Sequence, residues 1–180
     1  MRNTFFGSPY ICYNYIVPDN IALYIHFPFC RRRCGYCSFV SYQGGEAEIP
    51  VYLKALNAEM ARRSGGHGVR SIFFGGGTPS LLSTGQVGDI LSTAGSLFAV
   101  DPGAEITIEV NPGTVGGEYL GSLREQGVDR LSLGVQSLND RELELLGRIH
   151  TGAEAKDAVR LARGSGFANL NLDLIYGLPG

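Results

Sequence analysis

The sequence contains no long apolar run and no extended basic tract, and both absences limit what this chain can do. No stretch reaches the roughly 18 consecutive apolar residues of a membrane-spanning helix, so we predict no membrane span. The formal net charge of the 180 residues is −2, and no Lys or Arg cluster repeats along a helix face. We therefore predict no nucleic-acid partner. The one local exception is the run Arg31-Arg32-Arg33.

Secretory features are absent and cysteine is scarce. No charged start followed by a long apolar segment occurs in the first thirty residues, so we expect a cytoplasmic protein. Of four cysteines, three lie within eight residues: Cys30, Cys34 and Cys37. This clustering makes a poor disulfide framework, and in a reducing compartment clustered cysteines usually bind metal or do chemistry. Distant Cys12 is expected only to pack.

Glycine, in contrast, is abundant. The chain has 26 glycines in 180 residues, about twice the ordinary share of about 7%. They form no low-complexity tract, because they recur at the junctions between apolar runs. Tight connections between strands and helices require glycine at such places, so the pattern favours a fold with many short βα and αβ turns.

Apolar periodicity predicts alternating strands and helices. We expect strands at 21–27, 71–74, 105–110, 130–135 and 169–175, and helices at 50–63, 84–98, 118–126, 140–146 and 153–163. Pro50 suits the first turn of its helix, and Asp140 is expected to cap another. This alternation predicts an α/β fold with parallel strands and helical crossovers, either an open doubly wound sheet or a barrel.

The boundaries of the chain suggest a domain division. Residues 1–20 are rich in aromatic and turn residues without a clear period, and we expect an amino-terminal extension there. Residues 21–180 are expected to form one core domain. The sequence stops directly after the last predicted strand, before the helix that should cover it, so we expect this domain to be incomplete at its carboxyl end.

The spacing Cys30-x3-Cys34-x2-Cys37 is the strongest chemical signal. Three thiolates on one compact loop can each bind a different iron of a 4Fe–4S cluster, which leaves the fourth iron open for a small molecule. A structural zinc site is the main alternative, but it needs a fourth ligand, and His26 is the only nearby candidate. Unliganded thiols are the remaining alternative. A loop directly after the first strand is where α/β proteins often hold their chemistry.

Further motifs follow in order along the chain. They are Tyr24-Ile25-His26-Phe27-Pro28-Phe29-Cys30, Gly75-Gly76-Gly77-Thr78-Pro79, Glu109-Val110-Asn111-Pro112, the segment 130–137, Gly147-Arg148-Ile149-His150 and the segment 171–180. Together with the cysteines, this series resembles the radical S-adenosylmethionine superfamily, and within it the HemN/HemW branch. The resemblance implies a partial (β/α) barrel, truncated here, with a 4Fe–4S cluster and S-adenosyl-L-methionine as cofactors.

The resemblance also implies the residues that contact S-adenosylmethionine. By motif match they are Tyr24, Tyr36, Gly76, Gly77, Thr78, Glu109, Gln136, Arg148 and Asp173. Taken singly, Glu109, Gln136, Asp173 and Arg148 would more often be surface polar residues, and the triple glycine would more often be only a turn. Polar side chains at the carboxyl ends of parallel strands tend to face the site in such a fold. His26 should point to the same side as Tyr24, and it is either near the cluster or packed in the core.

The branch contains two functional classes, and one position bears on the choice. The coproporphyrinogen oxidases of the branch typically continue the motif as C-x3-C-x2-C-x-C, whereas here Phe39 stands two residues after Cys37. This form resembles the heme chaperones of the branch, which deliver heme to respiratory enzymes. The alternative is an oxygen-independent coproporphyrinogen III oxidase, so whether the protein is an enzyme stays open. Implied partners are heme or a porphyrin, and an electron donor such as flavodoxin or ferredoxin.

Overall fold

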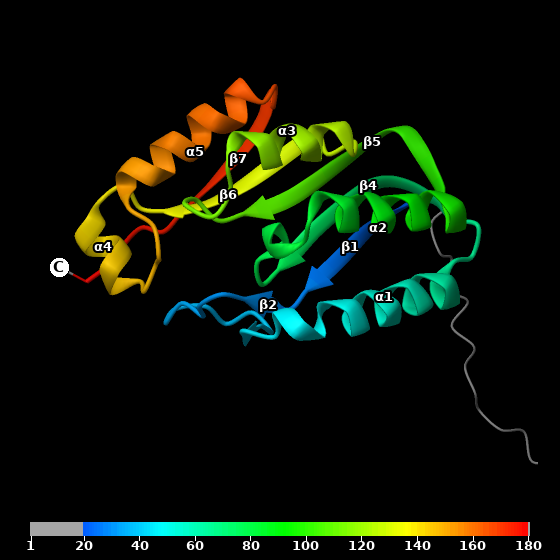
Figure 1. Cartoon of the computed structure of the whole chain (residues 1–180), viewed down its shortest axis with the longest axis horizontal. Helices are drawn as coiled ribbons and strands as arrows, with labels where there is room; N and C mark the ends of the chain where they lie inside the picture. The colour runs from blue at the N-terminus through cyan, green and yellow to red at the C-terminus, as the bar shows by residue number, and fades with distance from the viewer. Residues whose placement is uncertain (1–19, 180) are drawn as a thin grey trace, which may run out of the picture.

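The computed structural model describes residues 20–179, which form a five-stranded parallel sheet in the order β1-β4-β5-β6-β7 (Figure 1). The strands are β1 (Asn20–Phe27), β4 (Gly68–Gly76), β5 (Ala99–Val110), β6 (Arg130–Gln136) and β7 (Asn169–Leu174). The predicted α/β class with parallel strands is therefore confirmed. Because the strand order follows the chain order without reversal, the sheet is part of a barrel and not a doubly wound sheet.

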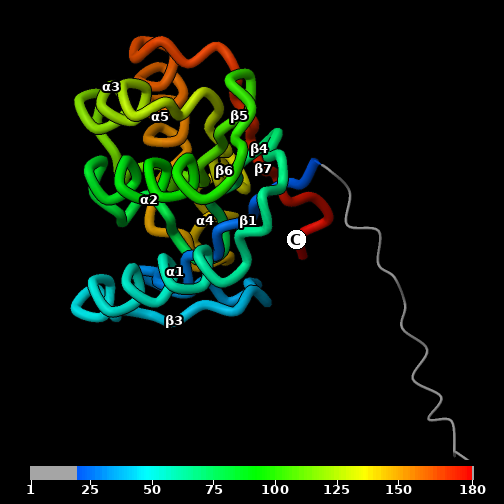
Figure 2. The backbone as a smooth tube through the Cα atoms, turned by 90° about the vertical axis from the view of Figure 1, so that its right-hand side faces the viewer, coloured from blue at the N-terminus to red at the C-terminus, as the bar shows by residue number. Residues whose placement is uncertain are grey.

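The four longer helices cover one face of this sheet (Figure 2). They are α1 (Ile49–Arg63), α2 (Thr84–Leu97), α3 (Gly117–Glu125) and α5 (Gly152–Gly164), and the short α4 is Asp140–Leu145. The apolar side chains between helices and sheet make the core, and Ile72, Phe74 and Leu131 are at most 1% exposed. Burying each such side chain stabilises the fold by about 1.5–3 kcal/mol.

Local sequence explains where most helices begin. Pro50 lies in the first turn of α1, as expected. Ser83 and Gln86 form a reciprocal capping box at α2. The expectation that Asp140 caps α4 is wrong, because the Asn139 side chain accepts from the N–H of Arg141 at 3.0 Å. The carboxylate of Asp140 instead accepts from the first main-chain N–H of α5, that of Gly152, at 2.7 Å.

Two strands begin earlier than the periodicity predicts. β4 begins at Gly68 and not at Ser71, and β5 begins at Ala99 and not at Glu105. Their pairing jumps from Val69↔Val100 to Ser71↔Glu105, so residues 101–104 have no partner in the ladder. This irregularity contains a proline and a glycine, which interrupt the alternation that identifies a strand. The expected extension over 1–20, with Cys12, lies outside the described residues apart from Asn20.

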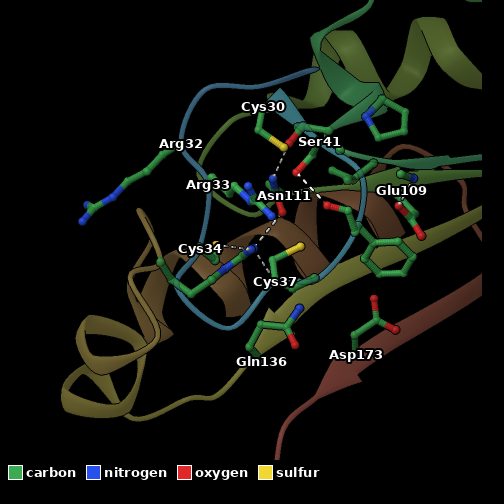
Figure 3. Close-up of a pocket in the computed structure, with 18 of the residues that line it drawn as sticks. Cys30, Arg32, Arg33, Cys34, Cys37, Ser41, Glu109, Asn111, Gln136 and Asp173 are labelled. Carbon is green, nitrogen blue, oxygen red and sulfur yellow. Dashed lines mark hydrogen bonds between the residues drawn. The ribbon is translucent and has the colours of Figure 1, made fainter. Parts of the chain in front are cut away.

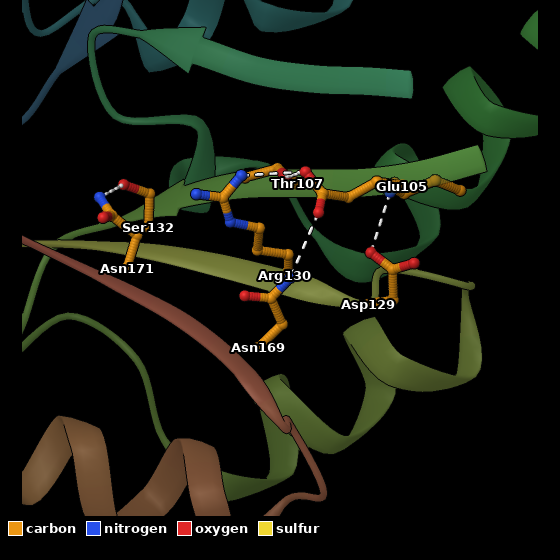
Figure 4. Close-up of polar contacts among 8 residues, drawn as sticks. Glu105, Thr107, Asp129, Arg130, Ser132, Asn169 and Asn171 are labelled. Atoms are coloured by element: carbon orange, nitrogen blue, oxygen red, sulfur yellow. Dashed lines mark hydrogen bonds and ion pairs between the residues drawn. The ribbon is translucent and has the colours of Figure 1, made fainter. Parts of the chain in front are cut away.

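The face opposite the helices is polar towards the amino ends of the strands (Figure 4). Arg130 pairs with Glu105 at 2.9 Å, and the side-chain amide of Asn169 donates to the same carboxylate at 3.2 Å. On the neighbouring positions, the amide of Asn171 donates to the hydroxyl of Ser132 at 3.0 Å. This face, which we call the open face, therefore carries hydrogen-bonded polar groups where the helix-covered face carries the core. Within the described residues, no helix has the length and apolar character needed to cross a bilayer.

Candidate functional site

A cavity of about 410 Å³ lies at the carboxyl ends of the strands (Figure 3). It is bounded by the cysteine loop on one side and by the open face of the sheet on the other. Every residue predicted for the site except Tyr24 lines it: Cys30, Cys34, Tyr36, Cys37, Gly76, Gly77, Thr78, Glu109, Gln136, Arg148 and Asp173. Segments that are far apart in sequence therefore meet at one place, which is what a binding site requires.

Main-chain hydrogen bonds close the cysteine loop. Two short parallel strands, β2 (Phe29–Cys30) and β3 (Tyr42–Gln43), flank it, and neither was expected from the sequence. The N–H of Tyr42 donates to the carbonyl of Pro28 at 2.7 Å, and that of Gly44 donates to the carbonyl of Cys30 at 2.8 Å. Inside the loop, the N–H of Cys37 donates to the carbonyl of Cys34 at 3.1 Å. These bonds present all three thiols to one cavity.

The arrangement of the thiols can be tested against the two metal alternatives. Over residues 20–179, no three His, Cys, Asp or Glu side chains gather closely enough to hold a single metal ion. A cubane cluster does not need such convergence, because each of its cysteines binds a different iron. His26, the candidate fourth ligand for zinc, does not line the cavity, and its Nε2 lies 2.8 Å from the carbonyl oxygen of Val40. The donor set fits a cubane cluster better than mononuclear zinc.

The triple glycine lies directly against the cysteine loop because no side chain fits there. The N–H of Gly77 donates to the carbonyl of Phe27 at 2.7 Å. A Cβ at Gly77 would lie 2.6 Å from the carbonyl oxygen of Phe29 and 3.0 Å from the sulfur of Cys30. Gly76 has a φ of 113°, which side chains rarely adopt. The glycines therefore form one wall of the cavity with main chain alone.

Two carboxylates from separate strands face the cavity. Glu109 is the penultimate residue of β5, and its Oε2 accepts from the N–H of Gly76 at 3.1 Å. Burial raises the pKa of Glu109, the Gly76 N–H lowers it, and the negative Asp173 raises it again. Asp173, on β7, accepts from the amide of Asn171 at 2.7 Å. Among the described residues neither carboxylate pairs with Lys or Arg, so the two are suited to a positively charged ligand.

Gln136 holds an unusual backbone conformation at the end of β6. Its φ is 67°, the only positive φ of a non-glycine residue in the part of the chain that the structure describes. Such a conformation costs on the order of 1–3 kcal/mol and persists only where surrounding structure enforces it. Here the carbonyl of Gln136 accepts from the N–H of Ile175 at 2.9 Å, which ties β6 to the chain after β7. The strained residue lines the cavity, as strained residues at functional sites often do.

Arg148 connects the far side of the cavity to the cysteine loop. Its Nη2 donates to the Asn111 side-chain oxygen at 2.7 Å and to the carbonyl of Gly134 at 2.6 Å. Its Nη1 donates to the sulfur of Cys34 at 3.5 Å, a contact between residues 114 apart in sequence. Asn111 in turn donates to the hydroxyl of Thr78 at 3.0 Å. One guanidinium therefore joins three segments of the site.

The two tyrosines occupy different places. Tyr36 lines the cavity, and burial raises its pKa to about 12, with Arg148 opposing the shift. Tyr24 is 54% exposed, does not line the cavity and stacks on Phe73 of the open face. Its hydroxyl lies 3.5 Å from Nδ1 of His26, so the expected shared side of these two residues is confirmed. Burial raises the pKa of Tyr24, and the carboxylate of Glu109 raises it further.

Sequence reasoning missed several residues of the cavity wall: Arg32, Arg33, Phe39, Ser41, Pro79, Val110, Asn111, Ser132, Gly134 and Ile175. Some could have been found. Ser132 and Gly134 share the two-residue period of Gln136 on β6, so the prediction of Gln136 already implied them. Asn111 stands directly after the strand that carries Glu109. Ser41 and Ile175 carry no comparable signal.

Comparison with known proteins agrees with this geometry. Residues 24–180 match the Radical SAM superfamily. The heme chaperone HemW of Haemophilus influenzae is 42% identical over 168 residues, which cover 88% of this chain and 44% of that protein. The mitochondrial radical S-adenosyl methionine domain-containing protein 1 of Bos taurus is 38% identical, over 88% of this chain and 36% of that protein.

Among solved structures, coproporphyrinogen III oxidase (HemN) from Escherichia coli superposes with a TM-score of 0.81 at 34% identity, over 88% of this chain and 37% of that one. This confirms the expected partial barrel. The chain spans less than half the length of the curated relatives it matches. A family that generally uses S-adenosylmethionine and a 4Fe–4S cluster accounts for the clustered thiols and the facing carboxylates. The chain belongs to the radical S-adenosylmethionine superfamily.

Proposed function

We propose that this chain is the cluster-binding part of a heme chaperone similar to HemW. The observation that carries the proposal is the 42% identity to HemW of Haemophilus influenzae across 88% of the chain. Phe39 supports the proposal. This aromatic residue lines the cavity, and it stands two residues after Cys37, where the coproporphyrinogen oxidases of the branch typically have a fourth cysteine. Heme, and respiratory enzymes that receive it, are the proposed partners.

Cys30, Cys34 and Cys37 are the proposed ligands of the 4Fe–4S cluster. A cluster held by these three thiolates would supply an electron to a bound S-adenosylmethionine. The main chain of Gly76 and Gly77 lets this cosubstrate approach closely, because no side chain intervenes. These assignments are supported by the single cavity that all five residues line.

The remaining contacts to S-adenosylmethionine are proposed from the same cavity. Glu109 and Asp173 would receive its positively charged groups, because both carboxylates face the cavity without a cationic partner. Thr78, Gln136, Arg148 and Tyr36 would orient it from the other walls. Tyr24, which stacks on Phe73 of the open face, would approach it from outside the cavity wall. Residues 21–180 are proposed to form one cluster-bearing domain of a cytoplasmic protein.

An acidic one-electron donor such as flavodoxin or ferredoxin is the proposed source of the electron. Arg31, Arg32 and Arg33 are all exposed, and they stand between two proposed cluster ligands in a chain of negative net charge. Positive charge on this loop would steer an acidic protein to the cluster and would act mainly on the association rate.

An oxygen-independent coproporphyrinogen III oxidase is the second candidate. The similarity to HemN of Escherichia coli, with its TM-score of 0.81, favours it. It differs from the chaperone in a measurable product, since it converts coproporphyrinogen III to protoporphyrinogen IX with loss of carbon dioxide.

Two assays on the full-length anaerobic protein separate the candidates. In the first, coproporphyrinogen III and S-adenosylmethionine are added, and we expect no protoporphyrinogen. In the second, heme is titrated and the Soret band is followed, and we expect saturable binding. The Phe39→Cys variant, which carries the cysteine that the oxidases typically have at this position, is assayed in parallel as a control. Formation of protoporphyrinogen by the unaltered protein would overturn the chaperone proposal, and so would a failure to bind heme.

A further inference from the structure

The guanidinium of Arg148 is fixed in place by groups other than the cysteine it contacts. Asn111, directly after β5, and the carbonyl of Gly134, in β6, accept from Nη2 at 2.7 and 2.6 Å. Nη1 is thereby directed at the sulfur of Cys34, 3.5 Å away. The sheet therefore supplies two of the acceptors that orient the guanidinium, and the cysteine loop supplies the third, the sulfur of Cys34.

This contact brings a permanent positive charge to a proposed cluster ligand. The guanidinium group of arginine is a fixed positive charge in proteins. Arg148 is half-buried, and its Nε is buried without a hydrogen-bond partner in the structure, so salt screens its charge less than that of an exposed residue. Arg31, Arg32 and Arg33 are exposed, and their charge is correspondingly more screened.

Hydrogen bonds to cluster sulfurs and nearby positive charge set the potential of iron–sulfur clusters. Reduction adds one electron to the cluster and makes it more negative, and no covalent bond to Arg148 forms or breaks. A donor N–H and a positive charge at Cys34 stabilise that reduced form more than the oxidised form. We propose that Arg148 raises the reduction potential of the cluster through its contact with Cys34, in addition to any contact with S-adenosylmethionine. The inference rests on the cluster of the proposed function, and Arg148 acts here as a positioning residue.

The test is the midpoint potential of the cluster in the full-length protein, measured by redox titration with EPR detection. S-adenosylmethionine is left out, so that a role in binding the cosubstrate cannot move the result. In Arg148→Gln we expect the equilibrium constant for reduction to fall about tenfold, which for a one-electron couple is about 59 mV. Arg148→Lys keeps the charge but loses the planar donor, and we expect a smaller fall, about threefold.

Arg160→Gln is the matched control. Arg160 is exposed, pairs with Asp157 and lies on α5, a helix that contributes no residue to the cavity, so its removal subtracts the same formal charge outside the site. We expect its midpoint potential to equal that of the unaltered protein. An unchanged potential in a cluster-loaded Arg148→Gln variant would overturn the inference and leave the proposed function intact.

If Arg148→Gln fails to assemble a cluster, Arg148→Lys decides the question. A lowered potential supports the inference, and a potential equal to that of the unaltered protein overturns it. If the unaltered protein itself assembles no cluster, the cofactor assignment of the proposed function fails first, and the inference about Arg148 falls with it.

Discussion

Replacing Gly77 by alanine tests the close approach of the glycine turn to the cysteine loop. The added Cβ would lie 2.6 Å from the carbonyl oxygen of Phe29 and 3.0 Å from the sulfur of Cys30. A return to ordinary contact at 3.4 Å would push that oxygen back by about 0.8 Å. The oxygen belongs to main chain and already accepts from the N–H of Thr78 at 2.8 Å, so it cannot move without breaking that bond.

Overpacking of this kind typically costs about 1–3 kcal/mol. We expect Gly77→Ala to lower the free energy of unfolding by about 2 kcal/mol. Because the displaced atoms include the Cys30 sulfur, we also expect the variant to retain less iron and sulfide after anaerobic reconstitution. Urea unfolding of the apo-protein measures the first effect, and iron and sulfide analysis of the reconstituted protein measures the second.

Gly95→Ala is the matched control for this substitution. Gly95 lies inside α2, is exposed, and a Cβ there would meet nothing within 4 Å. We expect that change to stabilise the protein by about 0.5–1 kcal/mol, because alanine favours a helix interior over glycine, and to leave cluster content unaltered. If Gly77→Ala matched Gly95→Ala in stability and cluster content, the reasoning from the glycine contacts would be refuted.

Three further predictions concern the same site. Because burial raises the pKa of Glu109, the contribution of its protonated form to stability is present at low pH and is lost as pH rises through that raised pKa. The urea concentration at the unfolding midpoint should therefore fall over that pH range. Glu109→Gln should abolish this pH dependence. His26→Leu removes the 2.8 Å contact with the carbonyl of Val40 that restrains the loop, so iron should pass to a chelator faster than in the unaltered protein. Replacing Arg31 and Arg32 by glutamate should slow reduction of the cluster by an acidic donor such as flavodoxin about tenfold at low salt. The rate of reduction by dithionite should not change. Equal rates with the acidic donor before and after the replacement would contradict electrostatic steering by these arginines.

Much of the fold could be predicted because its signals are local. Buried strands of a parallel sheet appear as short apolar runs, and glycines mark their ends, so all five strands of the main sheet were expected. The two-residue strands β2 and β3 were not, since two residues carry no periodicity. The start of β5 was missed because Pro102 and Gly103 interrupt its alternation.

Part of the candidate site could likewise be predicted from the sequence, and part of it could not. Motif match predicted eleven of the residues that line the cavity, and the parallel topology explains why Glu109 and Asp173, from separate strands, meet there. The contact of Arg148 with Cys34 joins positions 114 residues apart, and no local pattern encodes such a pairing. The positive φ of Gln136 was equally hidden, because glutamine gives no sign of a left-handed conformation in sequence. The residue that caps α4 could not be predicted either, because Asn139 and Asp140 are both good capping residues and only the structure shows that Asn139 is the cap.

Three thiolates of the cysteine loop are proposed to leave one iron open for S-adenosylmethionine. EPR of the full-length protein, reconstituted anaerobically and reduced with dithionite, tests it most directly. We expect the spectrum of a reduced 4Fe–4S cluster that changes shape when S-adenosylmethionine is added, and no such spectrum in a variant with Cys30, Cys34 and Cys37 replaced by serine. A cluster spectrum that S-adenosylmethionine leaves unchanged, or no cluster spectrum at all, would contradict the account.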